Sequence, residues 1–159
     1  MQPSEPISEE ASVKVLLLSE LEFENLANLT PPLVVCFGQF DVIHPGHIRY
    51  LQFAKAQGAT LIVALEGDRV GENDSLSSRY SASLRAQSLS ALGDVDCVVI
   101  LDSGGLELLV EQVRPNKLVL GKEYESPSLD QERKDKVLPA VGLIAKGNAE
   151  TIYAAGETH

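Results

Sequence analysis

Short apolar runs alternate with amphipathic segments along most of this chain. Four of the runs are almost continuously apolar, which is typical of strands buried on both faces of a parallel sheet. They lie at residues 33–37, 60–65, 96–101 and 117–120. A weaker run at residues 150–154 predicts a fifth strand. Residues 16–29 predict a short strand or turn followed by a helix, with Ser19 as its cap.

The segments between these runs have the spacing of helices. Pro45 suits the first turn of a helix over residues 48–57, and Gly58 predicts its end. Ile48, Leu51 and Ala54 recur at three-residue intervals and form its expected inner face. Further helices are predicted at residues 82–92, 106–113 and 129–137, with Pro139 ending or kinking the last of them.

Strands that alternate with helices predict an α/β fold. Crossover helices between buried strands imply a doubly wound, mostly parallel sheet of about five strands with helices on both faces. One domain over residues 13–159 is the simplest interpretation, and the polar residues 1–12 predict a disordered lead. In such sheets ligands bind beyond the carboxyl ends of the strands.

Charge and cysteine content narrow the classes of function. The net charge of −10, with only 13 Lys and Arg in 159 residues, argues against a broad nucleic-acid interface. No apolar run is long enough to predict a membrane span. Cys36 and Cys97 fall in predicted strands, where two buried free thiols are expected. A reducing compartment, the cytoplasm, fits this pattern.

The most informative segment is residues 38–47, Gly-Gln-Phe-Asp-Val-Ile-His-Pro-Gly-His. It follows a predicted strand and opens a predicted helix, so it forms a tight turn. A helix start offers unpaired backbone N–H groups and partial positive charge. His44 and His47 add two donors to that start. The combination predicts a polyphosphate site. The loop over residues 67–81 and Gly121 also follow predicted strands, so they are expected at the same carboxyl-end edge of the sheet.

This segment closely resembles the signature Gly-x-Phe-Asp-x-x-His-x-Gly-His of the cytidylyltransferase-like nucleotidyltransferases, which belong to the wider HxGH superfamily and have a Rossmann-like fold. All six specified positions match. Residues 48–51, 61–65 and 119–124, with Arg85, are similar to other segments of the sugar-phosphate members. Those members include heptose-1-phosphate adenylyltransferases and glycerol-3-phosphate cytidylyltransferases.

The resemblance implies transfer of a nucleoside monophosphate from CTP or ATP, with Mg²⁺, to a sugar or polyol phosphate, with release of pyrophosphate. His44 and His47 are the expected catalytic residues, which donate to the phosphates. Arg85, on a polar helix face, is expected to add a second positive clamp, and Asp41 to orient a ligand or hold Mg²⁺ through water. The full set of expected nucleotide and phosphate contacts is Gly38, Gln39, Phe40, Asp41, Gly46, Arg85, Gly121, Lys122, Glu123 and Tyr124. No direct metal ligand is assigned.

Two features depart from the family pattern. Residues 71–78 hold no lysine, although sugar-phosphate members usually carry one there. The chain stops at residues 156–159, about where the family's Ser/Thr-rich turn and last helix would begin, so the domain is expected to lack them. A catalytically weak nucleotide-binding or assembly domain of a larger protein is therefore an alternative function. Another HxGH branch, such as the flavin, pantetheine or nicotinate nucleotide adenylyltransferases, is a third. The base, the acceptor and a homodimeric state are left open.

Overall fold

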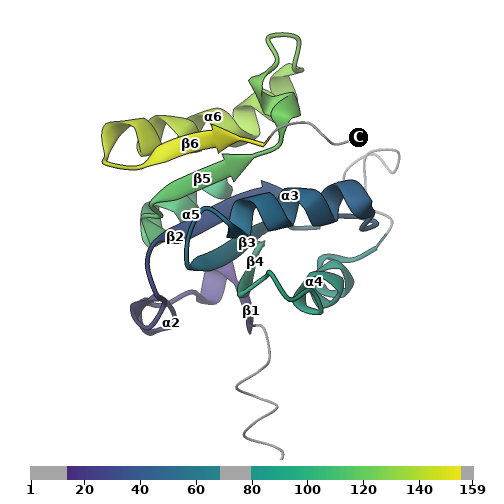
Figure 1. Cartoon of the computed structure of the whole chain (residues 1–159), viewed down its shortest axis with the longest axis vertical. Coiled ribbons are helices and arrows are strands. Elements are labelled where there is room, and N and C mark those ends of the chain that lie inside the picture. The colour runs from purple at the N-terminus through teal and green to yellow at the C-terminus, as the bar shows by residue number, and fades with distance from the viewer. Residues whose placement is uncertain (1–13, 69–79, 155–159) are drawn as a thin grey trace, which may run out of the picture.

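The computed structural model describes residues 14–68 and 80–154 and contains a parallel sheet of six strands in the order β1-β4-β3-β2-β5-β6 (Figure 1). The strands are β1 (Lys14–Leu17), β2 (Leu33–Gly38), β3 (Thr60–Glu66), β4 (Cys97–Leu101), β5 (Lys117–Leu120) and β6 (Glu150–Tyr153). The helices are α2 (Phe23–Ala27), α3 (Pro45–Lys55), α4 (Ala82–Ser90), α5 (Leu106–Val113) and α6 (Gln131–Lys146), with 3₁₀ turns η1 (Leu18–Glu20) and η3 (Lys122–Glu125). The predicted α/β class with helices on both faces is confirmed.

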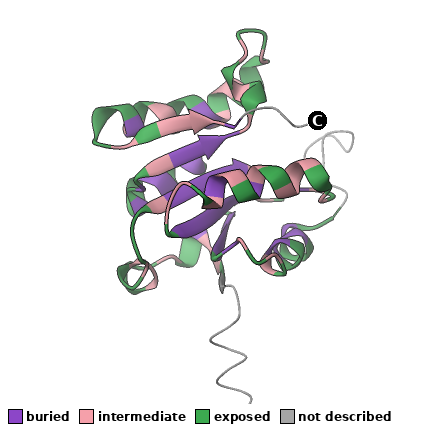
Figure 2. Cartoon of the chain, in the orientation of Figure 1, coloured by how far each residue is buried: buried purple, intermediate pink, exposed green. Residues whose placement is uncertain are grey.

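The sheet separates two apolar layers, because alternate side chains of each strand point to opposite faces. Val35 and Phe37 of β2 pack with α5 and α6, whereas Val34 and Cys36 pack with α3 and α4. In Figure 2 the buried strands lie between the partly exposed helices. Cys36 and Cys97 are buried and form no disulfide, as the sequence predicts, and they lie on opposite faces of the sheet.

The N-terminal part of the described chain differs from the sequence prediction. β1 adds a sixth strand, and it pairs with β4 from Lys14↔Cys97 onward. Ser19 does not cap a helix: its backbone N–H and hydroxyl both donate to the Asp102 carboxylate, at 2.9 and 2.6 Å. Glu22 occupies the N-cap of α2 instead. A long-range partner after β4 thus overrides the local capping preference of Ser19.

The last helix is longer than predicted. Pro139 lies inside α6, which runs to Lys146, so the expected end at residue 137 is wrong. Pro139 is exposed, and water can solvate the carbonyl group that the ring leaves without a donor. Val137, Ala140 and Ile144 stay buried against the sheet and hold the helix together across the proline.

The direction in which successive strands are added to the sheet reverses after β4, and β2 lies at the switch point. From β2 the chain proceeds through β3 to β4 on one side, whereas β5 and β6 lie on the other side. β2 pairs with β3 as far as Gly38↔Leu65, but with β5 only as far as Cys36↔Val119. β2 and β5 therefore part at their carboxyl ends, which is where open α/β sheets bind ligands.

Candidate active site

Two stacked imidazoles mark the turn between β2 and α3. The His44 and His47 ring centroids are 3.8 Å apart with a 25° angle between the planes. His44 is exposed and forms the N-cap of α3, and half-buried His47 lies on the first helical turn. The predicted pairing of these side chains at one helix start is confirmed.

Hydrogen bonds to the backbone orient both rings. His44 Nδ1 accepts from Gly46 N–H at 3.0 Å, and His47 Nδ1 accepts from His44 N–H at 3.3 Å. In the neutral form this network assigns each ring proton to Nε2. The expectation of unpaired N–H groups at this helix start is wrong for Gly46 and His47, because Gly46 N–H binds the His44 ring and His47 N–H binds the His44 carbonyl at 2.9 Å. The Nε2–H group of exposed His44 is consequently a donor that this turn offers, whereas His47 also hydrogen-bonds the Val42 carbonyl.

Phe40 fixes the shape of the turn. Its backbone is left-handed, with φ of 49°, and its ring is buried. The ring meets His47 edge-on at 5.2 Å between centroids. A Cβ on Gly38 would lie 2.7 Å from this ring, and one on Gly46 would lie 2.8 Å from His44 Cε1. Gly38 therefore makes room for the Phe40 ring, and Gly46 makes room for the His44 ring.

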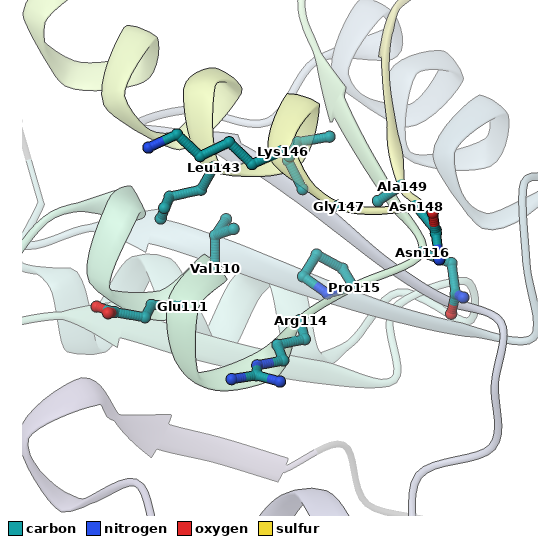
Figure 3. A pocket seen from close by; sticks show the side chains of 11 residues that line it. Val110, Glu111, Arg114, Pro115, Asn116, Leu143, Lys146, Gly147, Asn148 and Ala149 are labelled. Carbon is teal, nitrogen blue, oxygen red and sulfur yellow. The ribbon is translucent and has the colours of Figure 1, made fainter.

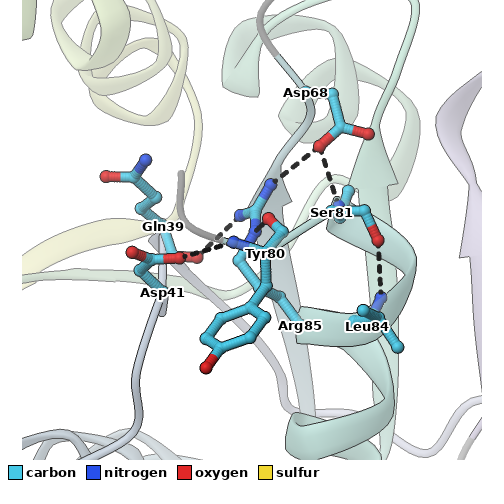
Figure 4. Close-up of polar contacts among 8 residues, drawn as sticks. Gln39, Asp41, Asp68, Tyr80, Ser81, Leu84 and Arg85 are labelled. Carbon is cyan, nitrogen blue, oxygen red and sulfur yellow. Dashed lines mark hydrogen bonds and ion pairs between the residues drawn. The ribbon is translucent and has the colours of Figure 1, made fainter. Parts of the chain in front are cut away.

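Arg85 is buried, with 1% of its surface exposed, although the sequence places it on a polar helix face. Its guanidinium donates to the Gln39 carbonyl at 2.7 Å and the Tyr80 carbonyl at 3.0 Å. It also lies 3.5 Å from the Asp68 carboxylate (Figure 4). These protein oxygens attract the side chain inward from α4. Arg85 thus ties the β2–α3 turn to the chain beside α4.

Asp41 reinforces the same connection. Its Oδ1 accepts a hydrogen bond from Tyr80 N–H at 3.2 Å, and Asp68 accepts from Ala82 N–H at 2.8 Å (Figure 4). Asp68 and Tyr80 flank residues 69–79, so the lysine-free segment 71–78 lies outside the described residues, as do residues 1–13 and 155–159.

The segment after β5 lies at the same edge of the sheet as the turn that carries His44 and His47. Tyr124 packs against Phe37 with 6.2 Å between ring centroids, and burial raises its pKa to about 12. Glu123 is close enough to His47 to influence the pKa of that imidazole. A cavity of about 320 Å³ is lined by Lys122, Glu123, Glu125 and Ser126. Lys122 itself pairs with Glu125 at 3.4 Å.

A larger cavity, of about 550 Å³, lies at the opposite edge of the sheet. Side chains from the ends of α5 and α6, including Val110, Arg114 and Leu143, line it (Figure 3). Neither His44 nor His47 lines it.

None of the helices in residues 14–68 and 80–154 is both long and apolar enough to cross a bilayer.

Sequence reasoning missed Tyr50, which lies on α3 beneath the histidines. Its ring stacks on Phe40 with 6.2 Å between centroids. Its hydroxyl contacts backbone groups of β2 and β5. The available signal was a polar-tipped aromatic on the inner face of the helix that follows the motif.

Burial, followed by the nearby His44 ring, lowers the pKa of His47 below its ordinary value of 6.5. The unfolded chain therefore binds this proton more readily than the native protein does. The His47 contribution to stability is fully present above about pH 6.5 and is lost as the pH falls toward the lowered native pKa.

Thermal unfolding between about pH 7.5 and pH 5.5 checks this sign. We expect the unfolding temperature of the native protein to fall over this range more steeply than that of His47→Asn. The asparagine keeps an oxygen acceptor near the Nδ1 position and removes the titrating ring. An equal fall of the unfolding temperature with pH in the two proteins would contradict the lowered pKa of His47.

A family model described as cytidylyltransferase-like matches residues 35–151. D-beta-D-heptose 1-phosphate adenylyltransferase of Bordetella bronchiseptica is 35% identical over 123 residues, which is 74% of this chain and 75% of that protein. Bifunctional protein HldE of Pseudomonas fluorescens is 38% identical over 116 residues, or 72% of this chain, but the match spans only 24% of that relative.

Solved structures show the same fold at lower identity. The lipopolysaccharide core biosynthesis protein from Thermoplasma volcanium superposes with a TM-score of 0.59 at 24% identity, over 77% of this chain and 95% of that one. Pantoate-beta-alanine ligase from Francisella tularensis gives a TM-score of 0.60 at 16% identity, over 89% and 66% of the two chains.

Proposed function

Because the chain belongs to the cytidylyltransferase-like family, we propose that it is a nucleotidyltransferase that transfers the adenylyl group of ATP to a sugar phosphate. The stacked pair His44 and His47, with each ring proton assigned to Nε2, is the observation that carries the proposal. The name of the Bordetella bronchiseptica relative supports ATP over CTP, and a sugar 1-phosphate as the acceptor.

The reaction needs in-line geometry and neutralisation of charge rather than a covalent enzyme intermediate. A phosphate oxygen of the acceptor attacks the α-phosphorus of ATP. The bond between that phosphorus and the bridging oxygen breaks, and pyrophosphate leaves with the bonding electron pair. The Nε2–H group of His44, and that of His47 once it exchanges the Val42 carbonyl for a phosphate oxygen, stabilise the negative charge that develops on the phosphate oxygens. The lowered pKa of His47 keeps its imidazole neutral near pH 7.

The remaining predicted site residues have two kinds of role in this proposal. Gly38, Gln39, Phe40, Asp41 and Gly46 form the turn that presents the histidines, and Arg85 holds that turn through the Gln39 carbonyl. The segment with Gly121, Lys122, Glu123 and Tyr124 borders the nucleotide on the β5 side. Arg85 thus acts through the turn, because its donors are directed at protein oxygens.

Magnesium fits this site as a partner of the triphosphate. Within the described residues, no three His, Cys, Asp or Glu side chains converge on a point suited to a metal ion. Mg²⁺ is commonly bound through substrate phosphates and one or two carboxylates, and Asp41 offers a carboxylate at the turn. The ion would supply positive charge to the phosphates.

A nucleotide-binding domain with slow turnover is the second candidate. It is favoured by the pairing of both predicted cations with protein groups: Arg85 with the Gln39 and Tyr80 carbonyls, and Lys122 with Glu125. Few positive charges are then left at this edge of the described chain to neutralise a triphosphate.

Pyrophosphate release separates the two candidates. The chain is incubated with Mg²⁺ and either ATP or CTP, against a panel of sugar 1-phosphates and polyol phosphates. Calorimetric titration with each nucleotide runs in parallel. Release that requires both ATP and a sugar phosphate supports the enzyme. Nucleotide binding without release supports the binding domain, and absence of both contradicts the proposal.

A further inference from the structure

The gap between β2 and β5 contains one unusual hydrogen-bonding group. The register Cys36↔Val119 is the last pair of these strands. In a parallel ladder with this phase, that pair already includes the bond from Phe37 N–H to the Val119 carbonyl. Continued by one residue, the ladder would place Phe37 opposite Leu120, and Gly121 N–H would donate to the Phe37 carbonyl. The ladder ends before that rung, so the Phe37 carbonyl needs another donor.

The Tyr50 hydroxyl lies where that next rung would form. It accepts from Phe37 N–H at 3.2 Å and lies 2.8 Å from the Val119 carbonyl oxygen, to which it donates. The Phe37 carbonyl oxygen, at 3.1 Å, is a second acceptor for the same proton. One hydroxyl thus bridges the two strands at the end of their ladder and occupies the place that Gly121 N–H would take beside the Phe37 carbonyl.

The ring of Tyr50 has a separate contact. It stacks on Phe40 with a 28° angle between the planes, and Phe40 in turn meets the His47 ring. Burial raises the pKa of Tyr50 well above its ordinary value, so the hydroxyl keeps the proton that it donates. The hydroxyl of Tyr50 therefore contacts β2 and β5 where these strands part, and its ring contacts Phe40, which packs against His47.

We propose that Tyr50 is a positioning residue: its hydroxyl sets the width of the crevice between β2 and β5 in which the nucleotide binds, and its ring, through Phe40, sets the orientation of His47. This inference rests on the proposed function, because it assigns the crevice to the nucleotide.

The two contacts predict different kinetic effects. Tyr50→Phe removes the hydroxyl and keeps the ring, so Gly121 N–H can approach the Phe37 carbonyl, extend the ladder between β2 and β5 and narrow the crevice. We expect the KM for ATP to rise about tenfold with kcat changed less than about threefold, since binding is lost equally in ground and transition states. Tyr50→Leu also removes the stacking on Phe40, and we expect kcat to fall by about tenfold as well.

Thr60→Val is the matched control. Thr60 is buried, and its hydroxyl donates to the Thr30 carbonyl at 2.7 Å at the opposite end of the sheet. This variant loses one buried hydroxyl and a hydrogen bond to a backbone carbonyl, as Tyr50→Phe does, but away from the crevice. We expect comparable loss of thermal stability in the two variants, with an unchanged KM for ATP only in Thr60→Val.

Full-length variants are compared in steady-state kinetics with ATP well below their unfolding temperatures. A KM for ATP that is unchanged in Tyr50→Phe, or raised equally in Thr60→Val, overturns the inference. If the unsubstituted chain binds ATP without turnover, the enzymatic proposal fails and the calorimetric Kd for ATP replaces the KM in the same comparison. An unchanged Kd in Tyr50→Phe then overturns the role of Tyr50, and absence of ATP binding to the unsubstituted chain overturns both proposals.

Discussion

Replacing His47 by alanine is expected to lower the kcat for nucleotidyl transfer by about 10²–10³-fold, the usual effect of removing one donor that stabilises transition-state charge. His47 Nδ1 is engaged by His44 N–H, so Nε2 is the donor that the substitution removes. The KM for ATP is expected to change far less than kcat, because the charge develops only as the α-phosphate is attacked. Steady-state kinetics with saturating ATP and sugar phosphate measure the effect.

Three companion variants show whether the donor itself matters. His47→Gln places an amide donor near the Nε2 position and is expected to recover part of the lost kcat. His47→Asn keeps only the Nδ1-like acceptor and is expected to resemble alanine. Gln52→Ala, at an exposed position of the same helix, is expected to leave kcat unchanged. A His47→Ala protein with near-normal kcat would remove His47 from the chemistry.

Arg85→Met is expected to lower the free energy of unfolding by about 3 kcal/mol, because a buried cation with several acceptors is removed and those oxygens lose their donors. Methionine fills a similar volume, which limits the contribution of a cavity. The Gln39 carbonyl is no longer fixed, so the turn that carries the histidines is expected to loosen and kcat/KM to fall with stability.

Urea denaturation measures the loss of stability, and Arg114→Met provides the control. Arg114 is exposed at the end of α5, where surface substitutions usually change stability by less than about 0.5 kcal/mol. Equal unfolding free energies for Arg85→Met and the unsubstituted protein would mean that the buried network contributes nothing to folding.

Most of the sheet is predictable from the sequence because its central strands are buried on both faces. Their apolar runs match β2, β3, β4 and β5 within a residue or two. β1 is short and lies at an edge, and its partner β4 is far along the chain, so no local pattern distinguishes it from a turn. Pro139 is a residue that normally ends a helix, but α6 continues past it with the proline on its exposed side. That continuation depends on the tertiary packing of Val137 and Ala140, which no local pattern shows.

The site shows a similar division. The spacing of His44 and His47 around a helix start is a local property, and the sequence predicts their proximity. The burial of Arg85 depends on Gln39, which is 46 residues away along the chain. The hydroxyl of Tyr50 likewise depends on Val119, at a separation of 69 residues. Side chains whose partners come from other elements cannot be assigned to solvent or interior from a single helical pattern.

The position of β1 at the sheet edge has a consequence for the order of folding. This strand is synthesised before the other five strands of the sheet, but its partner β4 begins only at Cys97. β2 and β3, by contrast, are joined by one helix and pair from Leu33↔Thr60 to Gly38↔Leu65. Contacts between neighbouring elements form at lower entropic cost than distant ones, so the β2–α3–β3 unit is the expected nucleus on the ribosome. The nascent polypeptide would then form its histidine turn while β1, synthesised before β2, is still unpaired because β4 has not yet been made.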